Sequence, residues 1–135
     1  MAVFNKVNSF IEYLAEAGFN LGSDQLKIAL TNTSHVSTWD RLSNLTEISY
    51  TNLSSRNITT SASLQTSGVY KLTLADLVLT ASGAVGPFRY IYIYDDTSTN
   101  DLLIGYYDHG SSISLANGQT YTIDFDGSNG VLQLV

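Results

Sequence analysis

The stretch Arg89-Tyr90-Ile91-Tyr92-Ile93-Tyr94 decides the fold of this chain. Successive side chains of a β-strand point to opposite faces, so the stretch puts three tyrosines on one face and two isoleucines on the other. Neither face is polar enough to lie in water, which is typical of a strand inside a sheet. We therefore predict a central strand. One of its faces packs on the core, and the other packs on the helix, the long loop or another subunit.

Short segments with two-residue periodicity surround this strand. They cover residues 26–30, 69–74, 77–79, 102–108, 120–125 and 131–135. Turn signals separate them at residues 95–101, 109–110 and 126–130, and at Asn117-Gly118, a strong hairpin dipeptide. Strands at intervals of about 8–12 residues indicate an all-β fold, an antiparallel β-sandwich or jelly roll.

One short N-terminal α-helix is predicted at about residues 6–17. Apolar side chains from Val7 to Leu14 recur at helical spacing, Asn5 is placed to cap the start, and Gly18 is placed to end it. The length of 135 residues fits a single domain, 1–135.

A long polar excursion follows at about residues 32–68. It is rich in Ser, Thr and Asn, and we expect one or two edge strands within it. A loop of this length is uncommon in a compact domain, so it is either functional or ordered by a partner.

The composition excludes several classes of function. There is no cysteine, which excludes thiol catalysis, disulfides and cysteine-ligated zinc. Charged residues make up 13%, against about 25% in average domains. The net charge of −6 and the six scattered Lys and Arg argue against nucleic acid and anionic membranes. We expect neither a secretory signal nor a membrane span. A weakly charged, tyrosine-rich surface suits contacts with proteins.

Catalysis by a Ser-His-Asp triad would need His35 or His109 as the base. His109 lies between Asp108 and Gly110-Ser111, but no Gly-x-Ser-x-Gly elbow is present. We interpret His109 as a turn residue and His35 as a surface or subunit-contact residue. A hydrolase with His109 as its base is kept as a minor alternative.

Acidic residues gather at Asp95, Asp96, Asp101 and Asp108. A glycosidase would need two such carboxylates facing one cleft, but Asp is also favoured in turns because its side chain bonds the local backbone. A Ca²⁺ site would use Asp95, Asp96, Thr97 and Asp101, although the spacing does not match an EF-hand loop. We predict that the protein is not an enzyme and has no catalytic residue, cofactor or metal.

The aromatic residues are the candidates for an interface. A stacked tyrosine platform on a β face also binds sugars in some proteins, and Tyr90, Tyr92, Tyr94, Tyr106 and Tyr107 would form it here. We favour packing in the core or between subunits. The predicted interface residues are Phe10, Trp39, Tyr50, Tyr90, Tyr92, Tyr94, Tyr106 and Tyr107.

Several segments resemble small virion structural proteins of tailed bacteriophages. They are residues 5–10 (NKVNSF), 22–33 (GSDQLKIALTNT), 68–72 (GVYKL), 77–83 (LVLTASG), 86–90 (GPFRY), 103–108 (LIGYYD) and 118–125 (GQTYTIDF). The resemblance covers nearly the whole chain except residues 34–65, a region that varies in such proteins.

This resemblance implies a particle component, and we expect a capsid decoration or cement protein. Its partners would be the major capsid protein and itself, as a homotrimer, with no nucleic acid and no membrane. It would reside on the capsid exterior, and in the host cytoplasm during assembly. The alternative is a tail or fibre module that binds host-surface glycan.

Overall fold

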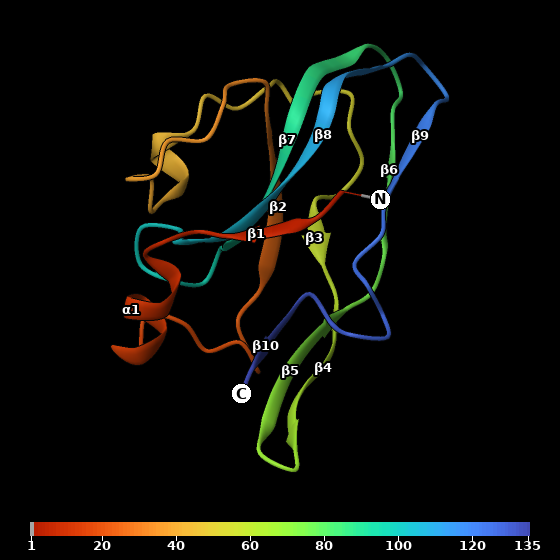
Figure 1. Cartoon of the computed structure of the whole chain (residues 1–135). Helices are drawn as coiled ribbons and strands as arrows, with labels where there is room; N and C mark the ends of the chain where they lie inside the picture. The colour runs from red at the N-terminus through yellow and green to blue at the C-terminus, as the bar shows by residue number, and fades with distance from the viewer. Residues whose placement is uncertain (1) are drawn as a thin grey trace.

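A five-stranded antiparallel sheet lies at the centre of the protein, in the order β1-β8-β7-β2-β3 (Figure 1). The computed structural model describes residues 2–135. The strands of this sheet are β1 (Phe4–Lys6), β2 (Leu26–Thr31), β3 (Asn57–Ile58), β7 (Val85–Asp95) and β8 (Leu103–Leu115). Strand β7 pairs with β2 on one side and β8 on the other, which confirms the predicted central strand.

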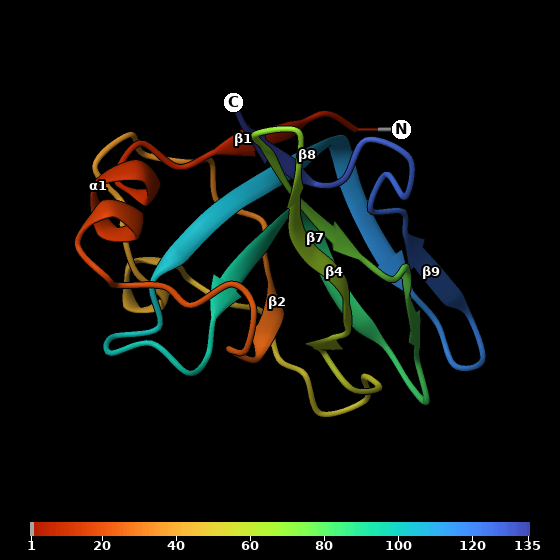
Figure 2. The ribbon, with the colours of Figure 1, turned by 90° about the horizontal axis from the view of Figure 1, so that it is seen from below.

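Two smaller antiparallel sheets complete the fold. One has the order β10-β5-β4, with β4 (Thr60–Thr66), β5 (Val69–Leu74) and β10 (Leu132–Leu134). The other pairs β6 (Leu77–Thr80) with β9 (Thr120–Ile123). Seen from below, α1 and β9 lie at opposite ends of the molecule (Figure 2). The prediction of an all-β antiparallel fold with one short helix is confirmed.

The two faces of β7 belong to two different apolar clusters. Ile91 and Ile93 pair with Leu30 and Ile28 of β2, and these four side chains lie in the large core that the smaller sheets close. The opposite face carries Tyr90, Tyr92 and Tyr94, with Ala29, Leu103, Val7 and Leu45 in a second cluster. Both faces are therefore covered by the chain itself.

The helix is shorter than predicted. Helix α1 spans Phe10–Ala15, and the prediction of residues 6–17 is wrong at both ends. Residues 4–6 are extended because they pair with β8, and Val7 N continues this pairing to Ile104 O. Ser9, not Asn5, is the N-cap residue. At the other end Ala17 adopts a φ of 65°, so the chain leaves the helical conformation before Gly18.

The polar excursion contains two edge strands, where one or two were expected. β3 is the last strand of the five-stranded sheet, and β4 is the last strand of the three-stranded sheet. A short 3-10 helix, Leu42–Asn44, lies in its first half. We call residues 32–50 the covering loop, because isolated bridges and backbone hydrogen bonds hold it across the tyrosine face. These join Thr31 to Glu47, Arg41 to Leu102, and Leu103 N to Asp40 O.

Strand β8 runs past the predicted turn at His109-Gly110. Tyr90 pairs with Asp108 and Phe88 with Ile113, so β8 advances five residues while β7 advances two. The three extra residues form a bulge in which Gly110 has a φ of 93°. Asn117-Gly118 does form a turn, but β9 beyond it pairs with β6 rather than β8. The expected hairpin is thus a connection between two sheets.

Candidate functional site

Four aromatic side chains meet on the tyrosine face, and we call them the aromatic cluster: His35, Trp39, Tyr92 and Tyr106. Tyr92 and Tyr106 are directly paired across β7 and β8, with ring centroids 5.2 Å apart. His35 and Trp39 come from the covering loop. The sheet therefore supplies the floor of the cluster and the loop supplies its outer layer.

His35 holds the cluster together. Its ring stacks on Tyr106 at 4.5 Å between centroids and meets the Trp39 ring edge-on at 5.8 Å. Its Nδ1 is hydrogen-bonded to the hydroxyl of fully buried Tyr92 at 2.8 Å. Desolvation lowers the pKa of His35, because burial disfavours the charged imidazolium. The half-buried ring is therefore neutral at pH 7.

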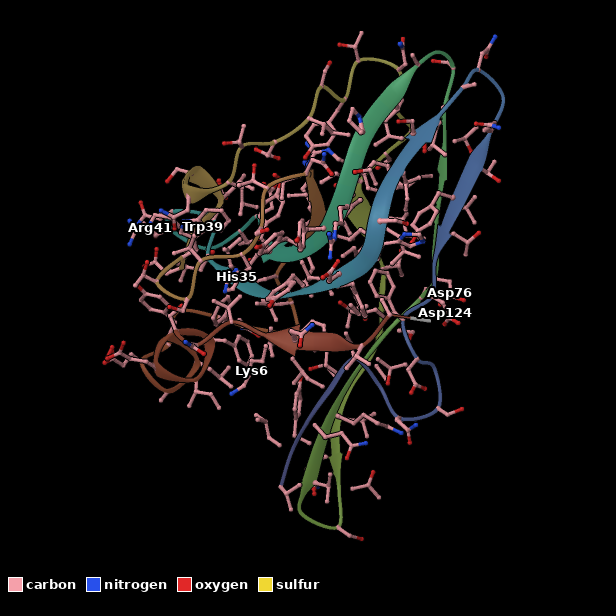
Figure 3. The ribbon with its side chains drawn as sticks, turned by 45° about the horizontal axis from the view of Figure 1, so that its top comes forward. Lys6, His35, Trp39, Arg41, Asp76 and Asp124 are labelled. Atoms are coloured by element: carbon pink, nitrogen blue, oxygen red, sulfur yellow. The ribbon has the colours of Figure 1, made fainter. Side chains whose placement is uncertain are left out.

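A polar chain beside the cluster ties the helix to the covering loop. The Tyr13 hydroxyl of α1 donates to Asp40 Oδ2 at 2.7 Å. Arg41 Nε and Nη2 donate to the two oxygens of the same carboxylate, each at 3.0 Å. These bonds to Arg41 lower the pKa of Asp40, so the carboxylate stays ionised. Figure 3 shows His35, Trp39 and Arg41 on the same side of the molecule.

The predicted interface residues fall into two groups. Five are buried within the chain: Phe10, Tyr90, Tyr92, Tyr94 and Tyr107. The other three, Trp39, Tyr50 and Tyr106, are half-buried. Tyr50 is engaged internally, since its hydroxyl accepts from Leu30 N and donates to Glu47 Oε1, and the Arg56 guanidinium lies 3.8 Å above its ring. Trp39 and Tyr106 are thus the members of the set best placed to meet a partner.

A concave region of about 740 Å³ lies between β1, β8 and β9, and His109 and Asp124 contribute to its wall. Asp108 is also in the wall, but it is held by Arg89 through two hydrogen bonds of 2.8 and 3.1 Å. Within residues 2–135, the hydrogen-bond partners of His109 are the carbonyl and hydroxyl of Ser111. No carboxylate orients the imidazole, as a triad would need. Figure 3 shows Asp124 beside Asp76, far from His35.

Asp95 shapes the loop between β7 and β8. It is fully buried, and its Oδ1 accepts hydrogen bonds from Thr97 N and Ser98 N, each at 3.0 Å. Its Oδ2 has no partner in the described chain. Burial, followed by a contact with the Asp24 carboxyl, raises the pKa of Asp95 to about 7. Of the Ca²⁺ candidates, Asp96 faces Lys27 at 4.0 Å and Thr97 Oγ1 accepts from Gln25 N.

The sequence did not predict three features of this region: the hydrogen bond between His35 and Tyr92, the trio Tyr13-Asp40-Arg41, and the proximity of the Asp24 carboxyl to Asp95. The pairing of β7 with β8 had a signal, because a hairpin loop at residues 95–101 makes the two strands neighbours. The exact partner of Tyr92 had none, because a register shift between Ile93 and Tyr94 places it opposite Tyr106. The sequence gives no signal for the contacts of His35 and Asp40, since these contacts depend on how the covering loop crosses the sheet.

A scan against protein-family models, a search of curated proteins and a search of solved structures each found no match. Among the described residues, no helix is both long and apolar enough to cross a bilayer. In the same part of the chain, no group of three or more His, Cys, Asp or Glu side chains is arranged to hold a metal ion.

Proposed function

We propose that this protein is a non-enzymatic structural protein of a tailed-phage particle, a decoration or cement protein that binds the major capsid lattice. The proposal rests mainly on the outer surface of the aromatic cluster. Trp39 and Tyr106 are half-buried there; Tyr106 lies on β8, and hydrogen bonds fix the covering loop that presents Trp39. Aromatic side chains held in place are the residues that contribute most to protein–protein contacts.

The weak charge of the chain supports the same proposal. With 13% charged residues, such a surface loses little solvation energy when a partner covers it. A decoration protein also needs no deep pocket, because many weak contacts on one lattice add to strong attachment. The resemblance to small virion proteins is consistent with this role.

Binding to particles tests the proposal. Purified protein is added to capsids that lack it, and bound copies and the rupture temperature are measured. We expect saturation at a fixed ratio to the capsid subunits and a higher rupture temperature. Trp39→Ala should weaken binding by about tenfold or more, as loss of a buried aromatic anchor does.

Val78→Ala is the matched control, because Val78 is an exposed apolar residue on β6, away from the aromatic cluster. It should bind like the unmodified protein. Absence of saturable binding, or equal losses in both variants, would overturn the assignment of this surface.

A tail or fibre module that binds host-surface glycan is the second candidate. It is favoured by the aromatic rings of Trp39 and Tyr106 beside the polar pair Asp40 and Arg41, since sugars stack on rings and bond to charged groups. Glycan-array binding that is lost in Tyr106→Ala would support it. If no glycan binds on the array while the protein binds the capsid lattice, the glycan role is excluded and the capsid role is kept.

A further inference from the structure

The hairpin of β4 and β5 extends away from the five-stranded sheet (Figure 1). Its turn is Ser67-Gly68, with φ values of 52° and 84°, the left-handed pair that a two-residue hairpin turn requires. Strand β4 is the outermost strand of its sheet, with β5 as its only paired strand in the described chain. One side of its backbone is thus available for pairing.

The register identifies which backbone groups face outward. Thr66 and Val69 flank the turn, and such flanking residues bond to each other. Bonded and non-bonded pairs alternate along an antiparallel ladder, so Leu64 bonds to β5 while the N–H and C=O groups of Ser63 and Gln65 point away from it. Correspondingly, the carbonyl oxygen of Leu72, the residue opposite Ser63, accepts a hydrogen bond from Val131 N on the β10 side at 2.8 Å.

The side chains of β4 do not protect this edge. Proteins usually guard long edge strands with charges, prolines or bulges. Residues 57–70 contain no charged residue and no proline, although the chain carries a net charge of −6. A register shift at Thr60 and Ala62 disturbs only the start of the strand. Leu64, in its middle, leaves 53% of its surface exposed.

We propose that β4 pairs antiparallel with β4 of a second copy, about a two-fold axis at Leu64. Ser63 of each copy then lies opposite Gln65 of the other, and each such pair exchanges two backbone hydrogen bonds. The two Leu64 residues form the non-bonded pair between them, where side chains approach closest. The pairing therefore satisfies the outward groups and buries the exposed leucine in one step.

A second copy is the partner that fits this edge. A two-fold contact requires a surface complementary to itself, and a strand paired about its own centre meets that requirement. Like net charges repel two copies elsewhere, but residues 57–70 carry no charge. The nearest cation is Lys71 on β5, opposite Leu64, and its Nζ donates to Ser128 O at 3.0 Å. One short strand buries less than a standard interface, so the contact is weak alone and gains strength where copies are held side by side.

Disulfide trapping tests the pairing directly, because the chain has no cysteine of its own. Leu64→Cys is compared with Val78→Cys, whose side chain is equally exposed at 52% on strand β6. Leu64→Cys should form a covalent dimer at least about tenfold faster under mild oxidation, because pairing raises the effective thiol concentration. Equal rates in the two variants would overturn the proposal.

Sedimentation at increasing concentration gives a test without a new thiol. The unmodified protein should associate to dimers, and Leu64→Lys should weaken association by at least about tenfold because the pairing brings the two ammonium groups together. Val78→Lys should not weaken it. A protein that stays monomeric at millimolar concentration would contradict the pairing. The capsid assay tests the proposed function separately from the pairing. A protein that stays monomeric in solution but still saturates the lattice would refute only the pairing.

Discussion

The covering loop over the tyrosine face and strand β4 of the hairpin both come from the polar, weakly charged excursion at residues 32–68, yet only the covering loop closes an apolar face of the chain. The covering loop closes the tyrosine face and leaves Tyr92 with no exposed surface. The hairpin keeps an unpaired edge and an exposed Leu64. Low charge alone therefore does not predict which surface is free to meet a partner.

The difference lies in how apolar residues are spaced along the excursion at 32–68. In its first half, apolar side chains recur at three-residue intervals at Trp39, Leu42 and Leu45. All three pack against the tyrosine face. Between residues 59 and 68, Leu64 is the only large apolar side chain. One leucine cannot hold a segment on the core, so this part of the chain stands as a hairpin.

Tyr92→Ala should show the largest effect, because it removes the floor of the covered face. Truncating a fully buried aromatic residue costs about 3–5 kcal/mol in free energy of unfolding. Tyr92→Phe, which loses only the bond to His35, should cost about 1 kcal/mol. Urea denaturation at pH 7 measures both. Similar small losses in the two variants would mean that the tyrosine face is not a packed core.

Asp95→Asn should stabilise the protein at alkaline pH. The pKa of Asp95 is raised to about 7, so the folded state holds a proton that the unfolded state releases near pH 4. The contribution of Asp95 to the free energy of unfolding therefore falls as the pH rises from about 4 through 7. The asparagine keeps the acceptor for Thr97 and Ser98 but never ionises, so at pH 8 we expect a gain on the order of 2 kcal/mol.

Thermal unfolding between pH 4 and pH 8 measures this gain. Asp96→Asn is the matched control, because that side chain is exposed, and it should leave the pH profile unchanged. A profile that falls equally in Asp95→Asn and in the unmodified protein would exclude the buried carboxyl as the cause.

Much of this architecture was predictable, because strand periodicity is a local property. The two-sided pattern at residues 89–94 identified β7 as central, and the polar composition at 32–68 indicated edge strands. The limits of α1 were not predictable, since Val7 shares helical spacing with Phe10 and Leu14 but lies outside the helix, directly after residues 4–6. They become β1 only because the edge of β8 is there to pair with.

The candidate site was less predictable than the fold. All eight interface candidates were chosen for aromatic character, but aromatic residues serve cores and surfaces alike. Tyr107 is buried and Tyr106, its neighbour, is half-buried, because successive residues of β8 face opposite sides of the sheet. Which side the chain would cover depended on the path of the covering loop, and that path rests on contacts distant in sequence, such as Tyr13 with Asp40.

His35→Ala tests how firmly the loop closes the face. The variant loses the stack on Tyr106 and the bond to Tyr92, which together are worth about 1–2 kcal/mol. Because burial lowers the pKa of His35, the stability difference between the unmodified protein and the variant should narrow as the pH falls below about 6.5. Hydrogen exchange across residues 32–50 should rise in the variant. Unchanged exchange there would mean that other contacts close the loop.

Leu64→Ser should have the smallest effect on the single chain. An exposed side chain away from the core changes the free energy of unfolding by no more than about 0.5 kcal/mol, so urea denaturation at low protein concentration should barely distinguish the variant. At high concentration the two proteins should separate, because pairing through β4 stabilises only the chain that keeps the leucine. The contrast with Tyr92 then becomes measurable: Tyr92 stabilises the single chain at every dilution, whereas Leu64 adds stability only where two copies meet. A large loss for Leu64→Ser at high dilution would place that leucine in the core of the single chain and remove the distinction between the two regions.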